Sequence, residues 1–491
     1  MAAVPSIRIR DCNDAPIRPG GHYVLYWMIA SRRLAFNFAL DRALEHAREW
    51  RKPLVILEAL RCDYPWASDR LHRFVLEAMA HNASVCASRG VLYYPYVEPA
   101  PGAGAGLLAA LAADACVVVT DEYPCFFLPK MVAAAAKQLS VRLEAVDSNG
   151  LLPLRAAERA FPTAHAFRRF LQKTLPAHLA EFPSSNPLAK ARAISRPSSL
   201  RKDVTSRWPA ASAVLLSGEP PSLAALPIDH AVAPIKERGG HARARVKMKM
   251  FLEKKLSRYP EDRNEPDVEG ASGLSFYLHF GHISVHEVFA AMARQENWKP
   301  ERLAVRSNGS REGWWNMNAG AEAFLDELIT WREVGYNFCS KREDYGCFES
   351  LPDWAQKTLQ KHACDERTNL YTLEEFESAG THDRLWNAAQ TQLVREGRIH
   401  NYLRMLWGKK ILEWSPTPQD ALATLLHLNN KYSVDGRDPN SYSGIFWCLG
   451  RFDRPWGPER PVFGTVRYMS SQNTARKFSV KDYLQKYGAM E

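Results

Sequence analysis

The chain of 491 residues lacks any apolar run long enough to span a bilayer. Its first residues, MAAVPSIRIRDCNDAP, lack the apolar core of a secretory signal peptide. Nine cysteines are scattered without a C-x-x-C pair, which is typical of free thiols in a reducing compartment and not of a disulfide framework. We therefore expect a cytoplasmic protein with no membrane segment, and the cysteine spacing predicts no metal site.

Two further features are missing. No G-x-G-x-x-G fingerprint follows the first strand-like run, so a dinucleotide site of the usual Rossmann type is not supported there. No internal repeat is visible. The length nevertheless exceeds what one hydrophobic core supports, so two or three domains are expected.

The balance of charge is basic. The chain carries 64 Lys and Arg against 54 Asp and Glu, a formal charge of +10. This favours an anionic partner, nucleic acid before a membrane surface, because no basic amphipathic anchor or lipidation motif stands out. A basic soluble enzyme without such a partner is the alternative, and charge alone does not exclude it.

Short apolar runs rich in β-branched residues alternate with helical patterns in the first 150 residues. The runs are 22–28, 53–60, 91–98, 116–124 and 141–148. Helix-patterned stretches, among them 37–50 and 70–90, separate them. This alternation predicts a parallel, doubly wound sheet, which we assign to an α/β domain over 20–183.

The pattern changes after this domain. Residues 184–240 are rich in Pro, Ser and Ala, which predicts a long interdomain linker. From residue 241 onward the patterns are nearly all helical, so 241–485 is predicted to be a second, mostly α domain. The fold class is therefore α/β followed by all-α.

Tryptophan is concentrated in the second half. Nine of the 14 tryptophans lie at or beyond Trp314. Leu and Ile fill a core without an N–H group that needs a partner, so packing does not require this bias. The excess favours a site that uses aromatic faces, for a flat ligand, for bases or for electrons.

Two short motifs suit a phosphate group and a planar ring. The turn 272–275, SGLS, precedes an apolar helical segment, where backbone N–H groups and hydroxyls can bind a pyrophosphate. An ordinary helix cap is the alternative. Glu327 and Trp331 are four residues apart on one predicted helix, so they can form a pocket for a ring with imide edges. A surface Glu above a buried Trp is the alternative.

The stretch 401–414, NYLRMLWGKKILEW, carries two indoles on one helix face. Trp407 and Trp414 are seven residues apart, about 10 Å along a helix. Arg404 and Met405 lie on the same helix. Core packing is the simplest interpretation of the stretch, and its own residues do not exclude a functional one.

The C-terminal block mixes aromatic and basic residues in a turn-rich segment. They are Trp447, Arg454, Trp456, Arg467, Tyr468, Arg476 and Lys477. Aromatics among cations suit a nucleic-acid strand whose bases stack and whose phosphates are neutralised. The turn 434–440, VDGRDPN, suits ribityl or ribose hydroxyls. A solvated loop is the alternative interpretation of the block.

Four segments resemble one known family. They are LWNAAQTQLVREGRIHNYLRMLWGKKILEW, LNNKYSVDGRDPN, DRPWGPERPVFGTVRYM and ELITWRE. Together they resemble the class II cyclobutane pyrimidine dimer photolyases of the photolyase/cryptochrome superfamily. The likeness is dense over 256–480 and looser over 20–180.

The resemblance implies a Rossmann-like domain that can hold an antenna chromophore of unspecified identity, and a helical domain that binds FAD. It implies light-driven repair, in which excited, reduced anionic FAD donates an electron to a pyrimidine dimer in DNA. The cyclobutane bonds break and the electron returns. The dimer leaves the duplex to reach the site. We expect a monomer.

Particular positions take roles from the resemblance. The implied FAD contacts are Tyr259, Ser272, Gly273, Leu274, Ser275, Arg404, Asn429, Asp435 and Gly436. The implied dimer contacts are Arg263, Asn264, Glu327, Trp331, Met405 and Trp447. Asn429 would face flavin N5, Arg404 would pair with Asp435, and Glu327 would bond the carbonyl and imide edge of the dimer.

The resemblance also implies an electron path. Trp407, Trp386 and Trp414 match the chain that reduces the flavin from the surface, with Tyr371 as a further member. The indole side chain suits this use because its cation radical is accessible. The path restores reduced flavin and takes no part in splitting the dimer.

The sequence departs from the family in three places. Phe38 stands where the family has Trp, in a stretch without the usual acids, and Phe452 stands where the family often has His. Residues 306–320, with Trp314 and Trp315 at their centre, look like an insertion. For this insertion we consider a lid over DNA or a disordered surface excursion.

Two other functions remain open from the sequence. A cryptochrome-like blue-light receptor would share the flavin and the tryptophans but signal through a partner. The matches at Glu327, Trp331, Met405 and Trp447 favour repair, because a sensor need not keep a dimer pocket. A helical nucleic-acid-binding module without flavin is the third candidate.

Overall fold

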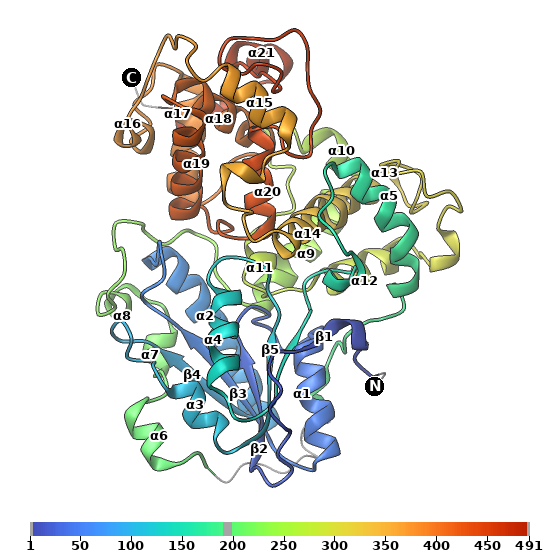
Figure 1. Cartoon of the computed structure of the whole chain (residues 1–491), viewed down its shortest axis with the longest axis vertical. Helices are drawn as coiled ribbons and strands as arrows, with labels where there is room; N and C mark the ends of the chain where they lie inside the picture. Colours follow the sequence, from blue (N-terminus) through green and yellow to red (C-terminus); the bar gives the residue numbers. More distant parts are fainter. Residues whose placement is uncertain (1–2, 190–198, 489–491) are drawn as a thin grey trace. The chain divides into compact units, whose positions relative to one another are not determined.

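The computed structural model describes residues 3–189 and 199–488 (Figure 1). The chain divides into two compact units. Unit 1 comprises Met1–Ala157, Leu175–Lys249 and Leu274–Asn297. Unit 2 comprises Glu158–Thr174, Met250–Gly273 and Trp298–Glu491. Each unit is thus built from segments that are far apart in the sequence.

Unit 1 contains a six-stranded sheet. Its strands are β1 (Ile9–Asp11), β2 (Tyr23–Met28), β3 (Leu54–Leu60), β4 (Leu92–Val97), β5 (Ala115–Asp121) and β6 (Leu143–Val146), in the order β1-β6-β5-β2-β3-β4. The five predicted runs form parallel pairs, as expected for a doubly wound sheet. The sequence analysis missed β1, a three-residue strand antiparallel to β6, because so short a run has no visible alternation.

Helices flank the sheet (Figure 1). Those of unit 1 are α1 (Phe38–Glu49), α2 (Asp69–Arg89), α3 (Leu107–Ala112), α4 (Leu128–Gln138), α6 (Lys202–Arg207), α7 (Ala213–Leu216), α8 (Pro220–Leu223), α11 (Ser275–His279), α12 (Val285–Gln295), and the short η1 (Ser6–Arg8), η2 (Leu154–Ala156) and η3 (Leu175–His178). The Asn37 side chain caps α1, and Gly90 ends α2 in a left-handed conformation. Phe38 is buried beneath the Arg8 guanidinium, so the residue that replaces the family's Trp is part of the core.

The stretch predicted to be a linker is packed in its described part. Leu216, Leu223 and Leu226 are buried in a cluster with side chains of β3, β4 and α2. Trp208 is 5% exposed and donates to the Ala103 carbonyl at 2.9 Å. Residues 199–240 therefore belong to unit 1, because their scattered leucines find apolar partners there. That the chain folds as separate domains over 20–183 and 241–485 stays a prediction.

Unit 2 is helical, and all six described strands lie in unit 1. Its elements are α5 (Ala164–Thr174), η5 (Leu256–Arg258), α10 (Tyr259–Asp262), η6 (Pro300–Arg302), α13 (Ala319–Leu325), the π-helical η7 (Asp326–Trp331), α14 (Arg332–Lys341), η8 (Phe348–Ser350), α15 (Asp353–Lys361), α16 (Leu373–Glu377), α17 (Arg384–Glu396), α18 (Asn401–Trp414), α19 (Pro418–Tyr432), α20 (Pro439–Cys448), α21 (Ser471–Lys477) and α22 (Lys481–Tyr487). Helix α9 (His241–Lys254) runs from unit 1 into unit 2. The predicted fold class, α/β followed by all-α, is confirmed.

The segment 306–320 is an ordered part of unit 2. Trp314 and Trp315 are 3% and 5% exposed, and the Trp298 indole donates to the Trp315 carbonyl at 2.6 Å. The expectation of a disordered surface excursion is therefore wrong, because its two indoles are buried. The alternative of a lid over DNA stays a hypothesis.

Helices α17, α18, α19 and α20 lie side by side (Figure 1). The Asp383 side chain caps α17, and Gly397 ends it with φ 67°. Trp386 on α17 and Trp407 on α18 are among the largest fully buried side chains. This helix group carries seven of the predicted site residues, namely Trp386, Arg404, Met405, Trp407, Trp414, Asn429 and Trp447. None of the helices described for the chain is both long and apolar enough to pass through a lipid bilayer.

Candidate active site

Glu327 lies in the π-helical segment η7, which interrupts a longer helix between α13 and α14. Its Oε1 accepts a hydrogen bond from Arg263 Nη1 at 2.7 Å, and the two side chains are 33% and 23% exposed. π-Helical turns are rare and frequently occur at functional sites. The periodicity of the sequence predicted a regular α-helix here and missed the π-turn.

The environment of Glu327 raises the pKa of its carboxyl. The main cause is desolvation by the surrounding protein, although a third of the side chain stays open to solvent. Arg263 opposes the rise, the neighbouring Asp326 adds to it, and Arg311 opposes it again. The direction of the shift means that this carboxyl is protonated more readily than a free glutamate.

Asp326 is held by a buried ion pair that the sequence analysis did not find. Arg168 on α5 donates through Nε at 2.7 Å and through Nη2 at 2.9 Å to the two carboxylate oxygens. The side chains are only 6% and 8% exposed. A bidentate pair of this kind fixes orientation as well as charge. It anchors the π-turn next to Glu327.

Tyr259, predicted to contact FAD, lies beside Arg263 in the same group. Its ring meets Phe251 and Phe324 edge to face, each with centroids 5.5 Å apart. The Arg263 guanidinium lies 5.7 Å from the Tyr259 ring centroid. Burial, followed by the charge of Glu327, raises the pKa of the Tyr259 phenol. The structure therefore brings Tyr259, Arg263 and Glu327 together.

Two other predicted residues near this group are half-buried. Trp331 closes the π-turn that contains Glu327, and Asn264 directly follows Arg263. Their predicted roles beside a dimer are hypotheses.

The predicted phosphate loop, residues 272–275, includes the position in the sequence where a segment of unit 2 ends and a segment of unit 1 begins. Ser272 and Gly273 end a segment of unit 2, and Leu274 and Ser275 begin a segment of unit 1. Gly273 has φ +67°, a conformation that favours glycine. Leu274 is buried and Ser275 is exposed at the start of α11, which has only five residues. So short a helix contributes less dipole at its N-terminus than the sequence suggested.

Asn429 is a buried residue of α19. Its amide nitrogen donates to Ser441 Oγ at 2.6 Å. The neighbouring Asn430 is also buried, and its Nδ2 has no hydrogen-bond partner in the described part of the protein. An orphaned amide donor in a buried site is costly unless a ligand or water accepts from it. This pair of amides is therefore suited to a buried, acceptor-rich group.

The turn after α19 is closely packed. Asp435 is 6% exposed and accepts from Ser433 Oγ at 2.5 Å. A Cβ on Gly436 would lie 2.7 Å from the Asn429 carbonyl oxygen and 3.0 Å from Asn430 Cα, so only glycine fits. Arg404 is half-buried on α18. Its predicted ion pair with Asp435 stays a prediction.

The three predicted electron-path tryptophans are buried and contiguous. Trp386, Trp407 and Trp414 are 0%, 2% and 2% exposed. The Trp386 indole N–H donates to the Trp407 carbonyl at 3.0 Å. The Trp407 indole donates to Gln390 Oε1 at 3.0 Å. Trp386, from α17, thus contacts both Trp407 and Trp414 of α18. The sequence did not indicate how far Trp386 lies from these two residues.

The surface end of this group contains Tyr371 and His382. Their rings lie 5.6 and 5.1 Å, centroid to centroid, from Trp414. The Tyr371 hydroxyl and His382 Nδ1 are hydrogen bonded at 2.5 Å. His382 is exposed and Tyr371 is partly exposed. The aromatic contacts therefore continue from Trp386 to the protein surface.

Met405 and Trp447, predicted to line the dimer site, are half-buried on α18 and α20. These two helices pack against each other. The sequence analysis missed Lys409, whose side chain is fully buried and lies over the Trp447 ring. The sequence pattern does not indicate whether the side chain of a lysine in an otherwise apolar helix is buried or exposed.

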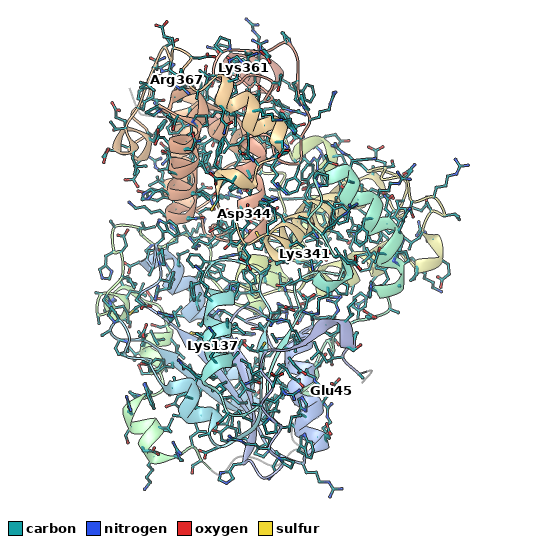
Figure 2. The ribbon with its side chains drawn as sticks, viewed as in Figure 1. Glu45, Lys137, Lys341, Asp344, Lys361 and Arg367 are labelled. Carbon is teal, nitrogen blue, oxygen red and sulfur yellow. The ribbon has the colours of Figure 1, made fainter. Side chains whose placement is uncertain are left out.

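The segment after α20 stacks cations on an indole. Arg454 and Arg467 lie 4.5 and 4.0 Å from the Trp456 ring centroid. Arg467 also pairs with Asp453 at 3.0 Å. Lys361 lies on α15 (labelled in Figure 2). Its Nζ pairs with Glu459 of the segment at 2.6 Å. These contacts order Trp456 and Arg467 in the predicted aromatic and basic block, while Arg454 and residues 457–461 are exposed to solvent.

Helix α21 adds two further cations, Arg476 and Lys477, which are both exposed. Lys477 Nζ lies 4.9 Å from the Phe478 ring centroid and 5.3 Å from that of Tyr402. Exposed cations near aromatic rings suit contacts with phosphates and bases.

Unit 1 contains a cavity of about 270 Å³ that the sequence did not predict. It lies where β2, β3 and β4 end, and Trp27, Tyr64, Tyr96 and Phe127 contribute aromatic rings to its lining. Ligands of open parallel sheets bind at carboxyl ends of strands near a switch in strand order, which occurs here between β2 and β5. Its lining suits a flat ligand.

Comparisons with known proteins find relatives over nearly the full chain. No family model matches the chain. The deoxyribodipyrimidine photo-lyase of Methanothermobacter thermautotrophicus is 36% identical over 481 residues, 97% of each chain. The protein of that name from Oryza sativa subsp. japonica is 34% identical over 97% of this chain and 89% of its own. The one from Potorous tridactylus is 30% identical over 96% and 82%.

A solved structure resembles the fold. It is the crystal structure of a bacterial class III photolyase from Agrobacterium tumefaciens, with a TM-score of 0.68 and 17% identity. The match covers 95% of this chain and 86% of that one. At this identity the likeness concerns the fold alone.

Proposed function

Because the chain belongs to the deoxyribodipyrimidine photo-lyase family, we propose that it repairs cyclobutane pyrimidine dimers in DNA by light-driven electron transfer from reduced FAD. We also propose that it is a class II member. The observation that carries the proposal is the hydrogen bond between Arg263 and Glu327 in the π-turn. A partly exposed carboxyl with a raised pKa, held by an arginine, is suited to the edge of a pyrimidine pair.

The residues around Glu327 would act by binding and orientation. The Glu327 carboxyl can donate to a pyrimidine carbonyl when protonated and can accept from an imide N–H when charged. Arg263 holds the carboxyl in place, and Arg168 holds the neighbouring Asp326. Trp331 offers a ring face for a flipped dimer.

The buried amides and the turn that follows them fit an FAD group. The orphaned Asn430 amide supplies a donor, Asn429 holds it in place through its own donation to Asn430 Oδ1, and Asp435 supplies an acceptor for ribityl or ribose hydroxyls. Arg404 supplies a cation. When bound, FAD supplies the electron that opens the cyclobutane ring. Tyr259 and the loop 272–275 complete the proposed set of FAD contacts.

The buried indoles would carry electrons from the surface to this site. Trp386, Trp407 and Trp414 are in contact through a hydrogen bond and an edge-to-face pair. Tyr371 would be a further member, because it contacts both Trp414 and solvent. We propose that this path keeps the cofactor reduced.

The DNA surface would consist of the cation-rich segment after α20 together with α21. Arg454, Trp456, Arg476 and Lys477 are its proposed contacts, with Met405 and Trp447 nearer the dimer. The cavity in unit 1 would hold an antenna chromophore, because its lining is aromatic and its position at the carboxyl ends of the strands is typical of ligand sites. We propose that the protein acts as a monomer.

The test is repair by the chemically reduced protein in light and in darkness, on oligonucleotides with one cyclobutane dimer or one (6-4) photoproduct. We expect repair of the cyclobutane dimer in light only. Light-dependent repair of the (6-4) product alone would contradict the proposed substrate. A flavin-loaded protein without any light-dependent repair would instead favour the photoreceptor.

A further inference from the structure

Lys409 is a fully buried cation of unusual surroundings. Its side chain is 0% exposed, and Nζ donates to the Cys448 carbonyl at 2.6 Å. Nζ also lies 5.1 Å from the centroid of the Trp447 ring. Within the described residues, no carboxylate lies within ion-pairing distance of this nitrogen. Buried lysines are rare and costly unless they are paired, so this one requires an explanation.

The groups that face Lys409 leave its charge largely uncompensated. Asp453 attracts it and Arg467 repels it, but these two form an ion pair with each other at 3.0 Å. Burial raises the pKa of the Cys448 thiol, so this thiol compensates Lys409 only where it is ionised. Arg467 is also near the Trp447 ring, at 5.6 Å. The Trp447 indole thus lies in a field of net positive sign.

The adjacent residue Lys410 provides the contrast. Its Nζ lies 5.2 Å from the centroid of the Trp414 ring, close to the distance between Lys409 and Trp447. Lys410, however, pairs with Glu413 at 2.6 Å. Two neighbouring lysines on one helix thus face two indoles, and only one of the lysines is neutralised by a partner.

A fixed cation opposes removal of an electron from an indole, because the product is itself a cation. At about 5 Å and an effective dielectric constant of about 20, the repulsion disfavours the oxidised indole by roughly a hundredfold. An ion pair at the same distance has a much smaller effect, because its two charges oppose each other. Trp447 should therefore be harder to oxidise than Trp414.

We infer that Lys409 protects Trp447 from one-electron oxidation, so that this indole can pack against the substrate while oxidation is directed to Trp414. The inference rests on the proposed function, in which Trp447 faces the dimer and Trp414 belongs to the electron path. Lys409 is a positioning residue for charge, since its Nζ contacts the Cys448 carbonyl and lies over the Trp447 ring. Its test can be made without light, flavin chemistry or DNA.

The protection should depend on pH. Burial lowers the pKa of Lys409 to about 8, with Cys448 and Asp453 raising it and Arg467 lowering it. Below that pH the ammonium is charged and the protection is present. As the pH rises through about 8, the charge and the protection are lost together.

The experiment uses the full-length protein in the dark with azide radicals as a one-electron oxidant. Each radical takes one electron from an indole and becomes azide, and the indole cation radical then loses its N–H proton to water. Dissolved dioxygen adds to the resulting indolyl radical and gives a stable oxygenated tryptophan. Peptide mass spectrometry measures the oxygenated fraction of Trp447 and of Trp414. We expect Lys409→Met to raise oxidation of Trp447 about tenfold at pH 7.

Lys410→Met is the matched control and should leave Trp447 oxidation unchanged. Lys409→Arg, which keeps the charge, should retain low oxidation. In the wild-type protein, Trp447 oxidation should rise between pH 7 and pH 9, while Lys409→Met should lack this rise. Acrylamide quenching checks that the exposure of the indoles is unchanged, and circular dichroism checks folding.

Equal oxidation of Trp447 in the wild-type protein and in folded Lys409→Met would overturn the inference. Increased oxidation of Trp447 in Lys409→Arg would overturn it as well. Failure of the proposed function is distinguishable, because it would appear as an absence of light-dependent dimer repair by the wild-type protein. The pattern of dark oxidation does not depend on that result.

Discussion

Trp386 and Trp414 meet edge to face, with ring centroids 5.9 Å apart and ring planes at 70°. The two residues come from different helices, α17 and α18. Their contact connects a fully buried indole to one that touches the partly exposed Tyr371. The aromatic contacts of unit 2 therefore continue from its core to Tyr371 at the surface.

Trp407→Phe should block photoreduction of the flavin while the chemically reduced protein still repairs dimers, because phenylalanine is much harder to oxidise than indole. Absorbance of the flavin during illumination with an external reductant measures photoreduction. Dimer repair in light measures the activity of the chemically reduced protein. Trp354→Phe, on α15, is the control outside the path. Normal photoreduction by Trp407→Phe would show that the path is assigned wrongly.

Glu327→Gln should lower the yield of dimer repair by about tenfold to a hundredfold while flavin stays bound, because one hydrogen-bonding group at the site of developing charge is altered. Repair per absorbed photon and the flavin-to-protein ratio are the measurements. The exposed Glu312→Gln is the matched control. Full repair by Glu327→Gln would refute the proposed role.

Binding of dimer-containing DNA should weaken as salt increases, because cations that contact phosphates release counterions from the DNA. Removing the charge at Arg454, Arg476 or Lys477 should reduce the slope of log affinity against log salt by about one each. Fluorescence anisotropy at several salt concentrations measures the slope. Lys137→Ala, on α4 of unit 1, is the control. An unchanged slope in all three variants would exclude this surface.

Arg168→Met should destabilise the protein by about 3–5 kcal/mol, because it leaves the buried Asp326 carboxylate without its partner. Denaturant unfolding followed by tryptophan fluorescence measures the loss. The double variant Arg168→Met with Asp326→Leu should recover most of the stability, since neither charge then remains buried. A double variant as unstable as the single one would contradict this explanation.

Stability should decrease in acid through Glu144. Although burial opposes it, hydrogen bonds from His46 and Arg42 lower the pKa of this carboxyl to about 2. A lowered pKa stabilises the folded protein above the unfolded value of 4.5, and this contribution is lost as the pH falls toward 2. The contribution of Glu144 to the free energy of unfolding amounts to about 3 kcal/mol.

Urea unfolding of the wild-type protein and of Glu144→Gln tests this dependence. The variant should be less stable at pH 6, and the difference should shrink at pH 3. Arg10, an exposed member of another ion pair with Glu122, offers a control through Arg10→Gln. A difference that stays constant with pH would contradict the assignment to Glu144.

Much of the fold was visible in the sequence. Five of the six strands were predicted, because a strand buried on both faces needs a continuous run of β-branched residues. The photolyase family was predicted from its motifs and is confirmed by identities of 30–36% over nearly the full chain. Class II membership, the cyclobutane substrate and the individual site residues stay predictions.

Other features depend on contacts between distant segments. The packing of Leu216, Leu223 and Leu226 against unit 1 was missed, because the Pro, Ser and Ala content of 184–240 suggested a linker. The burial of Trp314 and Trp315 was missed as well. The π-turn at Glu327 was missed because one extra residue in a helix leaves almost no trace in the hydrophobic pattern.

The sequence by itself determined five of the six strands, the helical character of the second half, the family to which the chain belongs and the side chains that can do chemistry. These are local properties, set by residue type and spacing. Only the tertiary structure decided which charges are paired. Arg168 reaches Asp326 across 158 residues, while Lys409 is buried over Trp447 with a carbonyl as its hydrogen-bond acceptor. Burial and pairing depend on neighbours brought together by packing, and residue type alone does not specify them.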